Sequence, residues 1–543
     1  MRPLCTIVGC VALLACAETS DPSQSAHRPG TRPSPPSLQV TLVGPERPEI
    51  RLARQLEVTS NRPVSLRVSL STDGEPTRIL DFGASSPQQT LPILALKADR
   101  QYRVVVTATD TDGRSSTQTR AIHTDALPLR WPRLETLVHR PDEMSPGYTL
   151  LDAKTTDPTA RYILILDPDL EPVWYWEAER SLTDTRITED GRLVVLESGD
   201  IRVTDLVGNS FGPWDTIGPV HHEAFPMPDD GLLTLATITA TSPWMPVDYD
   251  HPEDLEPDVP ILDTQVLRYD AQAKLLTSWP LHDILDTSRV GYDALNNATG
   301  GMDWVHANGV THDPTDGGFL VSLRHQDCII KLSPEGSLQW ILGNHMGWSP
   351  AFSPTLLQET GEPFLWPYHP HAPQVTDQGL VVLMDNGNHR ETPYGPPGPP
   401  KEDWFSRAVA YRVDEAAMTV EQVWEVRDTS TGPVYSGALG DADVLANGNV
   451  LATFGWVTQD NGVDNVDLGR GRRSSRLIEA RPDGEILLDL RLSSHYDNAP
   501  DGWKTYRAER VPELYPIETR PAIQTVPSVP ARRMKPPLED ARR

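Results

Sequence analysis

The chain is built from short segments in which apolar and polar residues alternate, separated by turns rich in Gly, Asp and Pro. Between residues 38 and 127, the segments LQVTLVG, SLRVSLST and YRVVVTATD show this period of two, and Asp-Gly pairs at 73–74 and 112–113 mark turns. Short strands at roughly ten-residue spacing are typical of an antiparallel sandwich of the immunoglobulin type. We therefore predict an immunoglobulin-like β-sandwich domain over residues 38–127.

From about residue 140 onward, one pattern recurs: a turn containing Gly, a strongly apolar strand, and further strands that often end near a Trp. Its clear starts are ITEDGRLVVLES (187–198), MPDDGLLTLA (227–236), DPTDGGFLVSL (313–323), VTDQGLVVLMD (375–385) and VLANGNVLATFG (444–455). Together with an opening half-repeat near 147–176, these starts predict a six-bladed β-propeller over residues 140–500. The predicted fold class is all-β, and residues 501–543 are predicted to be a C-terminal extension.

The first residues, MRPLCTIVGCVALLAC, combine an early positive charge with an apolar run too short to cross a bilayer comfortably. The small residue before Cys16 resembles a bacterial lipobox, so we predict a lipoprotein signal peptide over residues 1–16 with Cys16 lipidated. An ordinary signal peptide cut nearby is the alternative. Residues 17–37 are rich in Ser and Pro and predict a flexible linker. The expected location is the periplasmic face or cell surface. Ala17 favours the outer membrane if the cell has two.

The net charge and the cysteine count exclude several kinds of partner and site. The formal net charge of −28 opposes binding to nucleic acid, because polyanions would be repelled over most of the surface. Of the four cysteines, only Cys328 would remain after signal cleavage and lipidation, which excludes an internal disulfide and a cysteine-based metal cluster. Cys328 lies in the apolar segment DCIIKL and is predicted to be an inert buried thiol.

Three histidines precede three of the repeat starts at one shared position: His222 in HHEAFPMPDDG, His306 in HANGVTHDPTDGG and His371 in HAPQVTDQG. In a propeller the innermost strand of each blade lines the axial channel, so we expect these imidazoles to converge at one mouth. Asn308 should face the same side as His306, and Arg324 lies on the next strand of that blade.

These residue types favour an anionic substrate. The planar guanidinium of Arg324 pairs well with phosphate or sulfate oxygens and disfavours a divalent cation. Its charge would also keep neighbouring imidazoles neutral, and therefore nucleophilic. The pattern thus favours group transfer from an anionic ester over a metal site, and we expect neither a metal ion nor a cofactor.

Several motifs, in this order, resemble the bacterial arylsulfate sulfotransferase family over about residues 140–495. They are DWVHAN (303–308), SLRHQDCIIKL (322–332) with GSLQWILG (336–343), His371-Ala with Asp385-Asn-Gly387, and SRAVAY (406–411). The resemblance implies a sulfotransferase that moves a sulfuryl group from an aryl sulfate ester to an acceptor phenol, without a nucleotide sulfate donor. It also implies ping-pong transfer through a sulfohistidine intermediate.

The resemblance also implies residue roles. The nucleophile falls on His371, with His369 as a competitor. His306, Asn308 and Arg324 would hold the sulfuryl oxygens. His222 would be a further donor or an acid/base, and the alignment leaves His221 open in its place.

An aryl substrate needs an apolar aromatic rim. The candidates near the motifs are Trp304, Trp366, Tyr368 and Tyr394, and ordinary blade packing explains each of them equally well. The expected partners are small phenolic donors and acceptors, with membrane contact by the lipid anchor only and a homodimer left open. Two other functions remain: a non-catalytic, surface-tethered propeller that binds anionic or aromatic ligands, and a metal-dependent hydrolase or lactonase.

Overall fold

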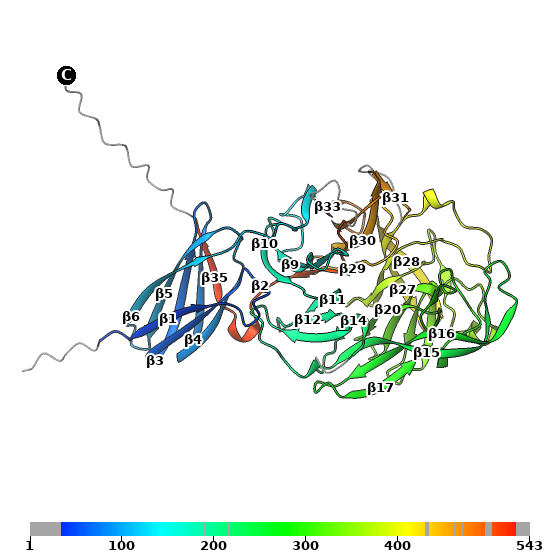
Figure 1. The fold of residues 1–543 in the computed structure, drawn as a ribbon, viewed down its shortest axis with the longest axis horizontal. Helices are drawn as coiled ribbons and strands as arrows, with labels where there is room; N and C mark the ends of the chain where they lie inside the picture. Colours follow the sequence, from blue (N-terminus) through cyan, green and yellow to red (C-terminus); the bar gives the residue numbers. More distant parts are fainter. Residues whose placement is uncertain are drawn as a thin grey trace, which may run out of the picture.

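The computed structural model describes residues 34–188, 190–214, 218–428, 434–460, 463–467, 471–494 and 502–527. The predicted signal peptide, its Cys16 and most of the linker over 17–37 lie outside these residues. Figure 1 shows a smaller body, made of N-terminal strands and the C-terminal β35, beside a larger body that contains most of the other strands. The described part of the chain contains no helix with the length and apolar character that crossing a membrane would require.

The N-terminal domain is an antiparallel sheet whose two longest strands bend. Its strands are β1 (Leu38–Val43), β3 (Arg54–Ser71), β4 (Thr77–Ile93), β5 (Gln101–Asp110), β6 (Ser115–His123) and β35 (Ala522–Val526). β3 pairs with β4 along both halves, with the register interrupted between Thr59 and Val64. Alternate residues of β5 are buried, which confirms the predicted period of two. The immunoglobulin type of sandwich stays a prediction, because β3 and β4 join both halves into one hydrogen-bonded sheet.

The larger body consists of six further sheets, each one blade. From the innermost strand outward, the first blade contains β34 (Ala508–Val511), β8 (Tyr148–Lys154), β9 (Arg161–Leu166), β10 (Pro172–Glu177) and β2 (Ile50–Arg51). The second blade contains β11 (Leu182–Ile187), β12 (Leu193–Glu197) and β13 (Asp200–Thr204). The third blade contains β14 (His221–Pro226), β15 (Leu232–Pro246), β16 (Leu255–Tyr269) and β17 (Leu275–Pro280), and β19 (Gly301–Asp303), with its partner β18 (Asn297–Ala298), is attached to β16. The N-terminal domain thus contributes β2 to the first blade.

The last three blades follow the same plan. The fourth blade contains β20 (Ala307–His312), β21 (Phe319–Leu323), β22 (Cys328–Leu332) and β23 (Leu338–Gly343). The fifth blade contains β25 (His371–Val375), β26 (Leu380–Asp385), β27 (Arg407–Asp414), β28 (Thr419–Val426) and β24 (Gln358–Thr360). The sixth blade contains β29 (Asp441–Val444), β30 (Val450–Asp460), β32 (Arg472–Ala480), β33 (Ile486–Ser493) and β7 (Arg133–His139), and β31 (Val463–Asn465) pairs with β30. The inner strands of neighbouring blades contact one another around the ring, from β8 and β11 to β30 and β34. The predicted six-bladed propeller is confirmed.

The recurring apolar runs form the second strand of each blade. β12, β21 and β26 are buried along their whole length, because neighbouring blades cover both faces of each sheet. Short 3₁₀ turns connect strands at η2 (Leu281–Asp283), η3 (Arg324–Gln326), η4 (Pro350–Thr355), η5 (Lys401–Asp403) and η6 (Ile517–Thr519).

The two ends of the chain close the ring. β7, which precedes the first blade, is the outermost strand of the last blade, and β34 is the innermost strand of the first. β35 then returns to the N-terminal sheet and pairs with β4. The extension predicted for residues 501–543 is therefore wrong for its described part, 502–527, which is integral to both domains.

Candidate active site

The innermost strands of blades 3, 4 and 5 begin with a distorted backbone. His222, His306 and Ala372 have φ angles of 62°, 42° and 48°, which non-glycine residues rarely adopt. Beside each of them, the pairing with the second strand slips in register. Such bulges re-aim side chains at the ends of strands. They place these residues at one end of the axial channel.

The three histidines do not share one register: in blade 4 His306 is itself left-handed and Ala307 pairs with Leu323, whereas blades 3 and 5 agree with each other. His371 pairs with Met384 and precedes the left-handed Ala372; in the same way, His221 pairs with Leu235 and precedes the left-handed His222. His221, rather than His222, is thus the counterpart of His371. Both blade-3 rings nevertheless reach the mouth. Their Nδ1 atoms lie 2.7 Å apart, and the His222 ring is 5.2 Å from that of His306.

His371 is buried, with only 2% of its surface exposed, and one of its nitrogens is committed. Its Nδ1 lies 2.6 Å from Asn386 Oδ1, while Asn386 Nδ2 donates to the backbone oxygens of Ser436 and Leu439. The Asn386 amide therefore presents its oxygen to the ring, so the ring proton sits on Nδ1 and Nε2 keeps a lone pair. Burial, together with the charge of Arg324, lowers the pKa of His371 to about 3.

Arg324 begins η3 directly after β21, one residue beyond the strand on which it was predicted. Its NH1 atom lies 2.5 Å from His325 Nε2 and 3.4 Å from Asp293 Oδ2, and its NH2 atom is 3.5 Å from the Gly437 oxygen. Two of these three contacts are long for hydrogen bonds, so the guanidinium retains donor capacity for a bound anion.

Tyr506 forms the floor between the imidazoles. Its ring centroid lies 6.2 Å from that of His222 and 6.3 Å from that of His371, and its hydroxyl donates to the Asn308 oxygen at 2.7 Å. We call His222, His306, Arg324, His371 and Tyr506 the histidine mouth. Sequence reasoning missed Tyr506 because it lies in the supposed extension. The alternating segment KTYRAERV, which reads as a strand, was the available signal.

Asn308 and Asp303 support the mouth from blade 4 and the segment before it. Asn308 is fully buried: its Nδ2 donates to the Pro370 oxygen at 3.0 Å, and its Oδ1 accepts from Ser322. It therefore ties blade 4 to the segment that carries His371. Asp303 Oδ2 lies 2.6 Å from His306 Nδ1, which gives His306 a carboxylate partner.

The four predicted rim aromatics do not surround the mouth. Trp304 is wrong as a rim residue, since it is fully buried and its Nε1 donates to the Arg289 oxygen. Trp366 packs against His345, and the hydroxyls of Tyr368 and Tyr394 accept hydrogen bonds from Asn344 and Val290. In the described part of the chain, we find no hydrogen bond or ring contact between these four residues and His371.

Another line of rings was not predicted. Tyr292 stacks on His389 at 4.6 Å, Trp404 lies 4.9 Å from His389, and Tyr435 lies 5.8 Å from Trp404. Burial raises the pKa of Tyr435, and the positive charge of Arg324 opposes that rise, so this line of rings ends near the guanidinium. These residues come from loops of three segments, so no local pattern connects them.

Two groups bring possible metal ligands within 4.8 Å of one another: Asp293 with His369 and His389, and Asp303 with His306 and His325. In both groups the carboxylate is already paired with a histidine, and Arg324 contacts Asp293 and His325. A cation would therefore meet a guanidinium at close range. We therefore assign no metal site to either group.

His369 and Cys328 are unsuitable as nucleophiles. Both ring nitrogens of His369 face carboxylate oxygens, those of Asp327 at 2.8 Å and Asp293 at 3.2 Å, so no lone pair is free. Cys328 is buried, as predicted, and burial raises the pKa of its thiol to about 12. Among the candidates, His371 alone combines a free Nε2 with a neighbouring guanidinium.

Next to the mouth, β11, β14, β29 and the residue before β34 carry a buried ionic layer. We define the salt-bridge layer as Asp184, Arg186, Glu223, Asp441 and Arg507. Arg507 donates to Asp184 and Glu223 at 3.0 Å and to Asp441 at 2.9 Å. Burial raises the pKa of Glu223 and of Asp441 to about 7. At the far end of the channel, a cavity of 660 Å³ is lined by residues such as Phe225 and Gln374.

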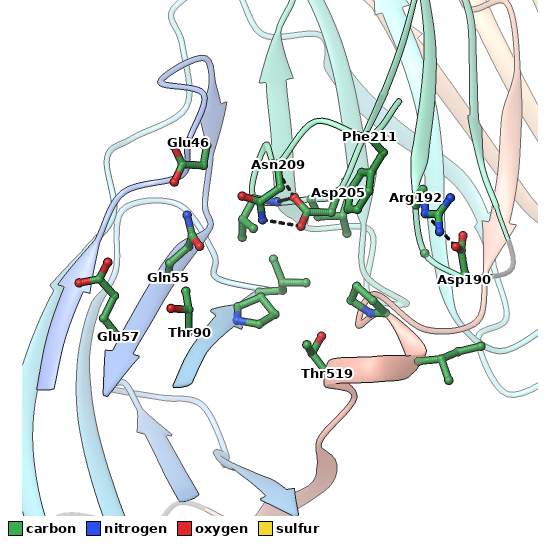
Figure 2. Close-up of a pocket in the computed structure, with 17 residues that line it drawn as sticks. Glu46, Gln55, Glu57, Thr90, Asp190, Arg192, Asp205, Asn209, Phe211 and Thr519 are labelled. Atoms are coloured by element: carbon green, nitrogen blue, oxygen red, sulfur yellow. Dashed lines mark hydrogen bonds and ion pairs between the residues drawn. The ribbon is translucent and has the colours of Figure 1, made fainter. Parts of the chain in front are cut away.

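A cavity of 670 Å³ also lies between the two domains. Figure 2 shows Gln55, Glu57 and Thr90 of the N-terminal sheet on one side, with Asp205 and Arg192 of blade 2 on the other. No residue of the histidine mouth lines it. This cavity is a separate feature of the domain junction.

Comparisons with known proteins show which family the chain resembles. The family model for arylsulfotransferase (ASST) matches residues 135–504. The chain is 26% identical over 244 residues to the arylsulfate sulfotransferase AssT of Escherichia coli O6:H1, covering 41% of this chain and 38% of that protein. It is 30% identical over 172 residues to AssT of Lelliottia amnigena, covering 28% of this chain and 26% of that protein. The chain thus matches less than half the length of these curated relatives.

Among solved structures, a protein of unknown function from Bacteroides caccae matches with a TM-score of 0.38 and 15% identity, covering 64% of this chain and 94% of that one. The fold and site define a six-bladed propeller with one mouth of its channel built from histidine and arginine side chains. Because the family model spans more than half of its residues, the chain belongs to the arylsulfotransferase family.

Proposed function

We propose that this protein transfers a sulfuryl group from an aryl sulfate ester to an acceptor phenol, with His371 as the nucleophile. The observation that carries the proposal is the buried imidazole of His371, which Asn386 holds with its Nε2 unprotonated beside the charge of Arg324. A neutral imidazole next to a guanidinium is suited to attack the sulfur of an anionic ester.

The transfer takes two steps. In the first, His371 Nε2 forms a bond to sulfur, the bond between sulfur and the aryl oxygen breaks, and the phenolate leaves with the electron pair. In the second, the oxygen of the acceptor phenol attacks the same sulfur and the bond from sulfur to nitrogen breaks. Donor and acceptor use one site in turn, which predicts ping-pong kinetics.

His306 is the imidazole best equipped to move the proton. It has a carboxylate partner in Asp303, whereas burial keeps the pKa of His222 well below its usual value and leaves that ring neutral. We assign His306 as the general acid and base: it gives a proton to the leaving phenolate and later takes one from the acceptor phenol. Arg324 and the His222 ring would bind the peripheral sulfuryl oxygens, on which negative charge is spread.

Incubation with p-nitrophenyl sulfate and phenol tests this function. Nitrophenol should appear faster with phenol than with water alone, and brief exposure to the donor should add one sulfuryl mass to the peptide containing His371. Binding of the donor without turnover would instead indicate a non-catalytic ligand-binding propeller. Loss of activity with a chelator would indicate a metal-dependent hydrolase.

We further propose export and lipid anchoring through Cys16, supported by the sequence pattern of residues 1–16. Fatty-acid labelling of the expressed protein should disappear in Cys16→Ser. Labelling that persists in this variant would rule out Cys16 as the anchor.

A further inference from the structure

Behind the histidine mouth, His369 lies between two carboxylates and has no solvent-exposed surface. Its Nδ1 is 2.8 Å from Asp327 Oδ1, and its Nε2 is 3.2 Å from Asp293 Oδ2. The backbone N–H of His369 donates to the same oxygen of Asp327, at 2.9 Å. The ring is therefore fixed at three points.

This geometry sets the protonation of the ring. Ionised carboxylates only accept hydrogen bonds, so an imidazole that contacts one at each nitrogen carries both protons. Burial alone would raise the pKa of Asp293, but the hydrogen bond from His369 and the charge of Arg324 lower it well below its usual value. Asp327 Oδ1 accepts from a backbone N–H, as an ionised oxygen does. His369 is thus an imidazolium.

The chain of charges continues to the substrate side. The Oδ2 atom of Asp293 that contacts His369 also lies 3.4 Å from Arg324 NH1. Asp327, His369, Asp293 and Arg324 therefore alternate in sign and sum to zero. Without the imidazolium, Arg324 would be the only cation beside Asp293, and the carboxylate would compete with any bound anion for the guanidinium.

We propose that His369 is a positioning residue that keeps Arg324 available to the sulfuryl group by sharing the charge of Asp293. The inference deepens the proposed function and rests on it for the role of Arg324. The other groups that face His369 are the rings of His325 and His389, at 5.9 and 5.7 Å. Burial lowers the pKa of both, so neither replaces the charge of His369.

Charge-balanced variants test the proposal. His369→Gln removes the cation and leaves Asp293 to Arg324, so the Kd for inorganic sulfate and the KM for p-nitrophenyl sulfate should each rise about tenfold, with a smaller change in kcat. The double variant His369→Gln with Asp293→Asn removes one charge of each sign. It should return both constants to within about threefold of the parent protein.

The matched control is His282→Gln. His282 Nδ1 lies 2.7 Å from Asp263 Oδ2 in the outer part of blade 3, so this change breaks a comparable pair away from the mouth. Sulfate binding should not change in this control. In a nitrogen–proton spectrum of histidine-labelled protein, the signals that vanish in His369→Gln should come from a ring with two N–H groups.

Unchanged sulfate binding in His369→Gln, no recovery in the double variant, or a single ring N–H for His369 would each overturn the positioning role. Sulfate binding and the spectrum require no turnover. A protein that shows the expected binding pattern but transfers no sulfuryl group would therefore refute the proposed function alone, and active protein without the pattern would refute this inference alone.

Discussion

Two neighbouring groups of residues along the channel use arginine in opposite ways. In the salt-bridge layer, Arg507 directs all of its nitrogens at carboxylates, with contacts of 2.9 to 3.3 Å to Asp184, Glu223 and Asp441. In the histidine mouth, Arg324 has one carboxylate contact, at 3.4 Å, and shares its remaining donors with a ring nitrogen and a backbone oxygen. Tyr506 and Arg507 are adjacent in the chain, as are His222 and Glu223.

The comparison shows that a buried charged group can either stabilise the fold or bind a ligand, depending on how completely it is paired. A buried ion that is fully paired has no capacity left for a ligand, and it resists rearrangement because each partner would be left uncompensated. A cation with long or weak contacts, next to neutral imidazoles, keeps the capacity to bind a transferred anion. The layer is therefore suited to rigid support, and the mouth is suited to the chemistry proposed for it.

The strongest test of this division is His371→Asn. Loss of the nucleophile should lower kcat/KM for p-nitrophenyl sulfate by about 1,000-fold or more, because the covalent step is lost. The free energy of unfolding should change by less than about 2 kcal/mol, since one side chain is shortened without creating an unpaired charge. Steady-state rates and denaturant unfolding measure the two quantities. An unchanged rate would remove His371 from the chemistry.

Asn386→Leu should have the next largest effect. Without the Asn386 oxygen, the His371 ring can place its proton on Nε2, and kcat should fall about 100-fold because the wrong nitrogen is then protonated. Asn449→Leu is the matched control, since this buried amide donates to the Glu143 oxygen and to Glu479 in blade 6. The control should lose stability but keep its turnover per folded molecule. Equal turnover in both variants would contradict a role for Asn386 in setting the tautomer.

Changes in the salt-bridge layer should act on stability instead. Arg507→Met leaves buried carboxylates without their cation and should cost about 3–5 kcal/mol of folding free energy, while the folded fraction keeps its activity within about threefold. Asp441→Asn is a milder change, because burial already raises the pKa of Asp441 to about 7 and Arg507 retains two carboxylates. A folded variant of either kind with activity reduced about 100-fold would show that the layer takes part in catalysis.

Site residues can be predicted from the sequence where their partners are close in the chain, and not where their partners come from distant segments. His306 and Arg324 are joined by a short motif within blade 4, and period-two alternation predicts the blades themselves. Asn386 directly follows β26, the strand that pairs with β25 in the same blade, so it is also local to His371. Tyr506 comes from a distant part of the chain and lies beside His371 only after the ring has closed. No periodicity identifies such partners.

Two points could not be decided from the sequence, for physical reasons. The choice between His221 and His222 stayed open because a left-handed residue inside a strand shifts the alternation without changing the apolar pattern. Trp304 was placed on the rim because a large ring beside a catalytic motif can face either the mouth or the blade core. Its hydrogen bond to the Arg289 oxygen decides for the core.

The response to pH is the smallest expected effect, and its sign differs between the histidine mouth and the salt-bridge layer. An ordinary histidine, with a pKa near 6.5, would lose roughly 25-fold of its neutral form between pH 7 and pH 5. Because the pKa of His371 is about 3, that ring stays neutral over this range, and its protonation should change kcat/KM less than about twofold. Pre-steady-state bursts between pH 5 and 7 measure this directly. A tenfold loss of burst rate between pH 7 and pH 5 would contradict the buried neutral state.

Stability should move in opposite directions in the two layers over the same range. The pKa of His371 is lower in the folded protein than in the unfolded chain, so its contribution is complete above pH 6.5 and is lost as the pH falls toward 3. The pKa of Asp441 is raised to about 7 on folding, so its contribution instead grows as the pH falls through 7. Comparing unfolding of the parent with Asp441→Asn and His371→Asn at pH 7 and 5 separates the terms. The pH slope should become steeper in the first variant and shallower in the second, because a neutral amide replaces a titrating group in each.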